Sequence, residues 1–182
     1  EKALNKERKR CVELVIDSNL YWMPSTLFTD VSMLNEFLRA VPKEYGTYGY
    51  MKELKESEDR HVVVEKPKGY PSLNYIGNEY LLEKQLADME KAGVDQAILK
   101  LPGCQEWLTL ELCKRFNDEV YNHVQQSGGK LRALAVVPPY GDEECLAELE
   151  RAVYELGFAG VQVSAHYGNV YLDNEMFKPF FR

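Results

Sequence analysis

Short apolar segments alternate with longer amphipathic ones from about residue 79 onward, and this alternation limits the fold more than any other feature of the chain. Buried strands are predicted at 96–101, 131–137 and 160–163. Amphipathic helices are predicted at 79–92, 107–126 and 142–156, and a further helix is predicted to begin at Asn174. Strands that alternate with helices of this length form parallel βαβ units, in which the helices cover the outside of the sheet.

One more strand is predicted near the N-terminus, at 11–17, and polar side chains follow it. Asp17, Asn19 and Tyr21 stand at alternate positions before Pro24, and the period of a strand predicts that their side chains share one face.

Polar residues also stand at the ends of the later strands, namely Lys100, Ser164 and His166. Such a collection favours a barrel with one site at its mouth. A doubly wound nucleotide fold is less well supported, because no glycine-rich phosphate turn follows a strand.

Residues 25–78 interrupt the alternation of strands and helices. A helix is predicted at 32–40, a charged helix-like stretch is predicted to end near Asp59, and a short strand is predicted at 61–65. A loop with Pro67, Gly69 and Pro71 follows. We predict that 25–78 is an insertion after the first strand, long enough to lie over a strand end as a lid.

The chain is too short for a complete barrel. Eight strands with their helices need about 250 residues, and this chain has 182 residues and four predicted barrel strands. The sequence therefore predicts an α/β fold of the (β/α)8 barrel type, with one domain at 1–182 that covers roughly the first half of the barrel. Because a half-barrel exposes two sheet edges, the chain is expected to be a fragment of a longer protein or to pair with another copy, as a dimer.

The composition of the chain limits the classes of partner that we expect. The formal net charge of −7 and the isoelectric point near 5.1 argue against nucleic acid and anionic membranes as partners. No apolar run has the ~20 residues of a membrane span, and no signal-peptide core is found, so a cytoplasmic protein is expected. The four cysteines match neither a zinc signature nor a disulfide framework, and reduced thiols are expected.

Four segments taken together resemble the amidohydrolase-related family, in the branch that includes aminocarboxymuconate semialdehyde decarboxylase. They are residues 16–24 (IDSNLYWMP), 86–95 (LADMEKAGVD), 116–119 with 134–138 (FNDE and LAVVP), and 148–173, which contains AHYGN. The resemblance implies a barrel that holds one divalent metal, zinc or manganese, through histidines of the first strand and a histidine after a later strand. His166 matches the later histidine, whereas Asn19 and Tyr21 stand where the family has its first-strand ligands.

These positions give the candidate site residues. Tyr21 and Lys100 are the predicted catalytic residues, Asn19, Trp22 and Gln162 are predicted to bind substrate, and His166 is the predicted metal ligand. Neutral amide and phenol groups are poor zinc ligands, so the metal is lost, or a harder ion binds through oxygen, or the site works without one. A surface role for Lys100 and a loop role for His166 are the alternatives. His61 and His123 are expected to be structural or exposed.

Two functions of different classes follow. The resemblance implies a metal-dependent hydrolase or non-oxidative decarboxylase that acts on a small, aromatic or unsaturated carboxylic acid. The replaced first-strand ligands favour instead a barrel that has lost catalysis and serves as a binding or assembly subunit. Turnover that depends on His166 would separate the two.

Overall fold

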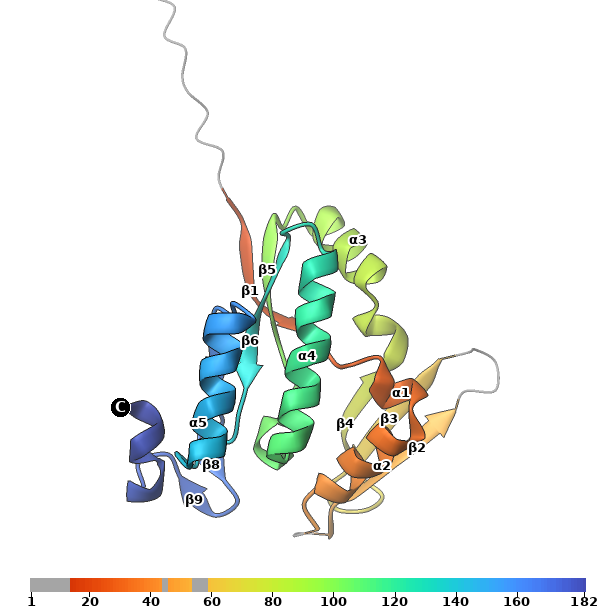
Figure 1. The fold of residues 1–182 in the computed structure, drawn as a ribbon. Coiled ribbons are helices and arrows are strands. Elements are labelled where there is room, and N and C mark those ends of the chain that lie inside the picture. Colours follow the sequence, from red (N-terminus) through yellow and green to blue (C-terminus); the bar gives the residue numbers. More distant parts are fainter. Residues whose placement is uncertain (1–13, 44–45, 54–58) are drawn as a thin grey trace, which may run out of the picture.

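A four-stranded parallel sheet forms the centre of the protein. A computed structural model describes residues 14–43, 46–53 and 59–182. The strands of this sheet are β1 (Ile16–Tyr21), β5 (Gln96–Lys100), β6 (Leu131–Val136) and β7 (Gly160–Gln162), in the order β1-β5-β6-β7. The helices α3 (Leu82–Ala92), α4 (Leu110–Gln126) and α5 (Glu143–Glu150) cover one face of the sheet, as Figure 1 shows. The predicted parallel βαβ architecture is confirmed.

Capping residues set the helix ends. Thr109 accepts a hydrogen bond from the backbone of Leu112 at the start of α4, and Asp142 does the same for Cys145 at the start of α5. Helix α3 ends at Gly93, whose φ of 70° places it in the left-handed region. The predicted starts at 79 and 107 are three residues early, because short 3-10 turns, η2 (Gly77–Tyr80) and η3 (Gln105–Trp107), precede these helices. Helix α5 continues into a π-helical turn, η4 (Arg151–Glu155).

The insertion is a small α/β unit. It contains α1 (Thr26–Thr29), α2 (Val31–Ala40), β2 (Tyr48–Glu53), β3 (Arg60–Glu65) and β4 (Pro71–Ile76), and the three strands form an antiparallel sheet in the order β2-β3-β4. Figure 1 places this unit at the end of the parallel sheet where β1 and β5 have their carboxyl ends. The insertion therefore lies on the side where a barrel carries its site.

One expectation for the insertion is wrong, and one of its strands was not predicted. Strand β2 covers 48–53, so residues 51–53 belong to a strand and not to the charged helix-like stretch, and residues 54–58 of that stretch lie outside the described residues. The predicted loop with Pro67 and Gly69 is present, and it ends at Pro71, where strand β4 begins without having been predicted. Both strands pair with β3, whose Val62, Val63 and Val64 are buried. The buried valines make β3 a central strand, and its two neighbours owe their conformation to that pairing and not to their own apolar pattern.

Strand β1 also differs from its prediction. It covers residues 16–21 and not 11–17, and residues 11–13 lie outside the described part of the chain. A bulge separates two stretches of its pairing with β5: Asp17 is opposite Ala97, and Tyr21 is opposite Lys100. Because Ala97 and Lys100 are three positions apart in one strand, their side chains lie on opposite faces of the sheet. The bulge therefore breaks the predicted alternation and places Asp17 and Tyr21 on opposite faces.

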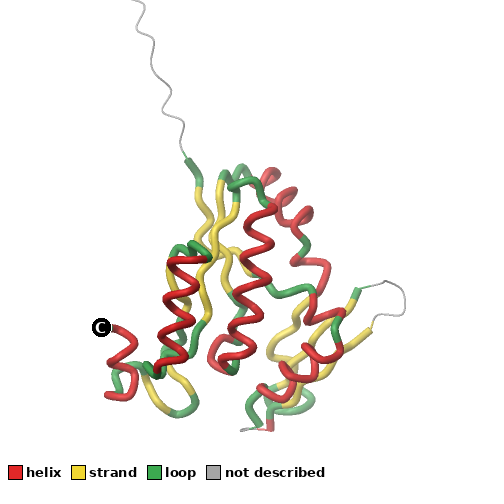
Figure 2. The backbone as a smooth tube through the Cα atoms, in the orientation of Figure 1, coloured by secondary structure: helices red, strands yellow, loops and turns green. Residues whose placement is uncertain are grey.

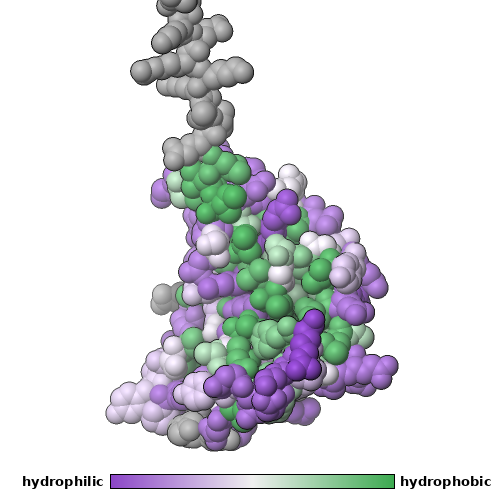
Figure 3. Space-filling view, turned by 90° about the vertical axis from the view of Figure 1, so that its left-hand side faces the viewer, coloured by the Kyte–Doolittle hydropathy of each residue, from purple (hydrophilic) through white to green (hydrophobic). Residues whose placement is uncertain are grey.

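The apolar residues at the start of β1 and just before it are exposed, although a buried strand was predicted at 11–17. Leu14, Val15 and Ile16 are 59%, 44% and 51% exposed. The sheet is open at β1 and β7, because neither strand has a second strand partner within 14–43, 46–53 and 59–182. Figure 3 shows hydrophobic surface gathered at the upper end of the molecule and continuing down the same side. Exposed apolar surface of this kind is what the predicted half-barrel would show.

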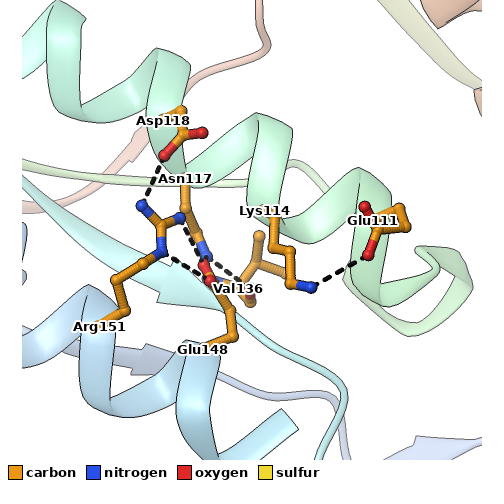
Figure 4. Close-up of polar contacts among 7 residues, drawn as sticks. All are labelled: Glu111, Lys114, Asn117, Asp118, Val136, Glu148 and Arg151. Atoms are coloured by element: carbon orange, nitrogen blue, oxygen red, sulfur yellow. Dashed lines mark hydrogen bonds and ion pairs between the residues drawn. The ribbon is translucent and has the colours of Figure 1, made fainter. Parts of the chain in front are cut away.

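A buried polar network joins the helices to β6 (Figure 4). The Asn117 side chain, fully buried, donates to the backbone carbonyl of Val136 at 3.0 Å and accepts from its N–H at 3.0 Å. Its amide also donates to Oε1 of Glu148 at 2.7 Å. Arg151 binds both oxygens of Glu148, at 2.8 and 2.9 Å, and reaches Asp118 at 2.8 Å. The network fixes α4 and α5 against the carboxyl end of β6.

The C-terminal segment contains a hairpin and a short helix, and Figure 2 follows its path. Strands β8 (His166–Tyr167) and β9 (Val170–Tyr171) form the hairpin. The predicted final helix is a 3-10 segment, η5 (Glu175–Phe181), that includes Pro179. Proline lacks the N–H that a continuing α-helix needs. Among the helices of the described residues, none is long and apolar enough to cross a membrane.

Candidate functional site

Tyr21 and Lys100 meet at the carboxyl ends of β1 and β5. The two residues are register partners, and the Lys100 ammonium lies 5.4 Å from the centroid of the Tyr21 ring. The backbone N–H of Trp22 donates to the carbonyl of Lys100 at 3.0 Å, so the strand pairing extends to this point. Tyr21 is 47% exposed. The structure therefore brings the two predicted catalytic residues together, on the face of the sheet opposite to the buried Ala97 and Leu99.

Gln162 joins the ends of two strands that are not neighbours. Its side-chain amide accepts from the N–H of Leu101 at 2.8 Å and donates to the carbonyl of Leu101 at 3.0 Å. Because β6 lies between β5 and β7, this amide bridges across the middle strand. Gln162 thus holds the site end of the sheet together, and its predicted contact with substrate stays a prediction.

Trp22 belongs to the core that supports the site. It is 3% exposed, and its ring lies edge-on to His123 of α4, with ring centroids 5.7 Å apart. His123 Nε2 lies 2.9 Å from Oε1 of Gln85, and the Gln85 amide donates to the carbonyl of Tyr21 at 2.8 Å. Trp22 therefore packs beside α4, and its predicted contact with substrate stays a prediction. Gln85 and His123 help to hold Tyr21 in place, but the sequence gives no sign of this role, because both residues lie on helices, away from the strand ends in the chain.

His123 makes folding stability depend on pH. Burial lowers the pKa of His123 from its usual 6.5 to about 4. Between these two values the unfolded chain binds a proton that the folded chain does not, so stability is full above pH 6.5 and falls as the pH decreases toward 4. Because His123 is only partly buried, solvent screens part of this effect, and we expect urea unfolding to show a loss of about 1–2 kcal/mol between pH 6.5 and pH 4. The variant His123→Gln should not show this loss of stability at low pH. If the free energy of unfolding depends on pH in the same way for the variant and wild type, His123 is not the group responsible.

His166 lines a cavity of about 630 Å³ between the insertion and the loops after β5 and β7. The insertion contributes Ala40, Pro42, Thr47, Val64, Lys66 and Ser72, and the barrel side contributes Glu106, Trp107, His166, Gly168, Asn169 and Tyr171. The exposed His166 ring has Nδ1 3.1 Å from the carbonyl oxygen of Gly168 and lies edge-on to Tyr171. The insertion thus forms one wall of a cavity at the strand ends, and its predicted role as a lid stays a prediction.

A hydrogen-bonded chain fixes the barrel side of this cavity. The Gln105 amide donates to Oγ of Ser164 at 2.7 Å, and the Ser164 hydroxyl donates to Oε2 of Glu106 at 3.0 Å. Glu106 and Trp107 also line a neighbouring cavity of about 700 Å³. The sequence indicates Ser164 at a strand end, but it gives no sign of Glu106, which lies in a short turn without any recognisable motif.

The candidate residues do not converge on one cavity. Asn19 and Tyr21 are absent from the lining of the cavity that holds His166. Asn19 is exposed and lies in the bulge of β1, where its N–H donates to Oδ1 of Asp17 at 2.8 Å. The Cys104 thiol beside the cavity wall is fully buried, and burial raises its pKa, so it is not a reactive group.

The described residues do not fit a zinc or manganese centre. His61 lies in β3 and His123 in α4, so His166 is the one imidazole at the strand ends. Asn19 and Tyr21 offer an amide oxygen and a phenol in place of imidazoles. No group of three or more His, Cys, Asp or Glu side chains with the arrangement of a metal site occurs in 14–43, 46–53 and 59–182. We therefore derive no chemical step through a metal.

A family model and several solved structures are similar to this chain, and they point to the same family. Residues 70–182, more than half of the chain, match the family model described as amidohydrolase. The structure of a 5-carboxyvanillate decarboxylase from Novosphingobium aromaticivorans, complexed with manganese and 4-hydroxy-3-methoxy-5-nitrobenzoic acid, is similar, with a TM-score of 0.62 and 26% identity over 93% of this chain and 47% of that chain. A dihydroxybenzoic acid decarboxylase from Polaromonas, with bound manganese and 2-nitroresorcinol, has a TM-score of 0.58 and 20% identity over 93% and 45%.

A third similar structure is a 2,6-dihydroxybenzoate decarboxylase from Rhizobium, with a TM-score of 0.52 and 20% identity over 93% of this chain and 45% of that chain. The chain thus spans less than half the length of each of these proteins. The similarity confirms the predicted fold class: the parallel sheet with its outer helices is a half-barrel of the (β/α)8 type.

Proposed function

Because this chain belongs to the amidohydrolase family, we propose that the protein acts on a small aromatic or unsaturated carboxylic acid, by non-oxidative decarboxylation or by hydrolysis. The observation that carries this proposal is the contact between Lys100 and Tyr21 at the carboxyl ends of β1 and β5. A fixed cation beside a phenol is suited to bind a carboxylate next to an aromatic ring. The similar proteins are described as decarboxylases with bound aromatic ligands, which supports the substrate class.

Lys100 has the role of holding the substrate carboxylate. Its ammonium donates up to three hydrogen bonds, and stacking over the Tyr21 ring limits the positions it can take. The backbone of Tyr21 is held in turn by Gln85, and the end of β5 by Gln162. These contacts place the cation before the substrate arrives, which reduces the entropy lost on binding.

Tyr21 is the proposed proton donor. When a carboxylate leaves as carbon dioxide, the electron pair of the broken bond stays on the carbon atom, and that carbon must take up a proton. The Tyr21 hydroxyl is a donor beside the proposed carboxylate site. In a hydrolysis the same hydroxyl would donate to a substrate oxygen. Asn19, exposed on the same strand, is proposed to contact a further oxygen of the substrate.

Replacing Lys100 with methionine should weaken carboxylate binding. A charge-assisted hydrogen bond contributes about 1.5–3 kcal/mol, so we expect the Kd of an aromatic acid such as benzoate to rise by a factor of roughly 10 to 100. Ligand-observed NMR titration measures this change. Lys91→Met is the matched control, because Lys91 lies exposed in the last turn of α3, away from the strand ends. If wild type and Lys100→Met bind benzoate with equal affinity, Lys100 does not bind the carboxylate.

A barrel without catalysis is the second candidate function. The amide of Asn19 and the phenol of Tyr21 in the first strand favour it, because both are poor replacements for imidazole ligands. This candidate predicts that acids bind and raise the melting temperature while none is consumed. Substrate consumption that His166→Ala abolishes would exclude it. His166 remains the proposed metal ligand only if residues outside the described part of the chain complete a centre around it.

A further inference from the structure

The peptide unit between Tyr21 and Trp22 is held from both sides. On one side, the N–H of Trp22 donates to the carbonyl of Lys100 in β5 at 3.0 Å. This peptide is trans, and a trans peptide directs its N–H and its carbonyl in opposite directions. The Tyr21 carbonyl therefore points away from β5, and there the side-chain amide of Gln85 in α3 donates to it at 2.8 Å. One peptide unit thus connects a helix residue to the strand that carries Lys100.

Gln85 is buried, and His123 of α4 sets the orientation of its amide. Because Nε2 of Gln85 donates to Tyr21, its Oε1 faces His123, whose Nε2 lies 2.9 Å away. An amide oxygen only accepts hydrogen bonds, so His123 carries a proton on Nε2 and donates it. A Gln85 amide turned by 180° would place donor against donor at His123 and oxygen against oxygen at Tyr21. The His123 ring also lies edge-on to Trp22, which follows the held peptide unit.

We propose that Gln85 and His123 are positioning residues, which fix the direction in which the Tyr21 side chain leaves β1 and thereby its contact with Lys100. This inference rests on the proposed function, because it assumes that a carboxylate binds at Lys100. The Tyr21 ring is 47% exposed, so the backbone, more than packing around the ring, must hold it beside the Lys100 ammonium. A pair that is fixed before the ligand arrives loses less entropy on binding. Neither Gln85 nor His123 touches the ligand in this proposal.

A double-mutant cycle with benzoate tests this role. Gln85→Met keeps the length of the side chain but removes its donor, and we expect the Kd of benzoate to rise roughly three- to tenfold in ligand-observed NMR titration. In the Lys100→Met background the same change should alter the Kd less than about twofold, because Gln85 acts only through the pair of Tyr21 and Lys100. Gln125→Met, at an exposed position of α4, is the matched control and should leave the Kd unchanged in both backgrounds.

Two NMR measurements need no ligand. Near neutral pH, the ring nitrogens of His123 in wild type should show the tautomer with its proton on Nε2. His123→Phe keeps an aromatic ring against Trp22 but removes this donor. In both His123→Phe and Gln85→Met, hydrogen exchange of the Trp22 N–H should be at least about tenfold faster. Exchange of the Val136 N–H, which donates to Asn117 at 3.0 Å in β6, should stay as in wild type and thus report that the change is local.

The outcomes separate this inference from the proposed function. Thermal melts show whether each variant is folded, and His123→Phe replaces Gln85→Met in the cycle if the latter is not. If Lys100→Met weakens binding but Gln85→Met does not, or weakens it equally in both backgrounds, the inference is overturned while the proposed function stands. A His123 proton on Nδ1 in place of Nε2 has the same meaning. If benzoate does not bind to wild type, or if Lys100→Met binds it as wild type does, both are overturned.

Discussion

Arg151→Met is expected to lower the free energy of unfolding by about 3 kcal/mol, because it leaves the Glu148 carboxylate buried without its cation. The Glu148 side chain is 1% exposed, and Arg151 contacts both of its oxygens. Proximity to Glu148 and Asp118 raises the pKa of Arg151, so the guanidinium stays charged in the folded protein. Removing one member of such a pair costs more than the pair itself contributes to stability. Urea unfolding measures the change.

Two companion variants make the test of the buried pair specific. Asp118 is 58% exposed, so Asp118→Asn should cost less than about 1 kcal/mol, as exposed ion pairs do. The double variant Glu148→Leu with Arg151→Met removes both charges and should recover part of the stability that Arg151→Met loses. A loss below about 1 kcal/mol for Arg151→Met would mean that water solvates the Glu148 carboxylate in the folded protein. That result would contradict the burial of Glu148 in the structure.

Phe37→Ala is expected to cost about 3–5 kcal/mol, the usual range for removing a buried phenylalanine ring. Phe37 of α2 is fully buried and stacks on Phe116 of α4, with ring centroids 6.4 Å apart and an interplanar angle of 12°. Its ring also contacts Tyr75 of β4, at 6.0 Å, and Trp107 beside the cavity, at 6.4 Å. One side chain therefore connects the insertion, the barrel helices and the cavity wall.

Urea unfolding of Phe37→Ala, with Phe37→Leu as the conservative control, measures this cost. The leucine variant keeps most of the apolar volume and should lose less than half as much stability. Hydrogen exchange should also accelerate in β2, β3 and β4, because the insertion would lose its main aromatic contact with α4. If Phe37→Ala costs less than about 1 kcal/mol, the insertion packs on the barrel through other contacts.

The parts of the fold that the sequence predicted well are those with strong periodicity. Strands β5, β6 and β7 and helices α3, α4 and α5 agree with the apolar patterns to within a few residues, because each buries one face against the others. The insertion was harder to predict, because β2 and β4 owe their conformation to pairing with the buried strand β3. Propensity within a short segment does not reveal such a tertiary partner.

The site was predictable at its strand ends and less so elsewhere. Lys100 and Tyr21 were selected for their positions after apolar runs, and the structure places them in contact. The bulge in β1 was not predictable, because alternation alone does not show where one extra residue enters a strand. Glu106 and Gln85 were missed because each acts through contacts with residues more than fifty positions away. The predicted dimer stays a prediction.

The most direct test of the proposed activity is mass spectrometry of a mixture of aromatic and unsaturated carboxylic acids after incubation with the purified protein. We expect at least one acid to be consumed, with a decarboxylated or hydrolysed product, and we expect Lys100→Met to slow this reaction while Lys91→Met does not. If acids bind to the protein but none is consumed, the enzymatic proposal is contradicted and the barrel acts as a binding subunit.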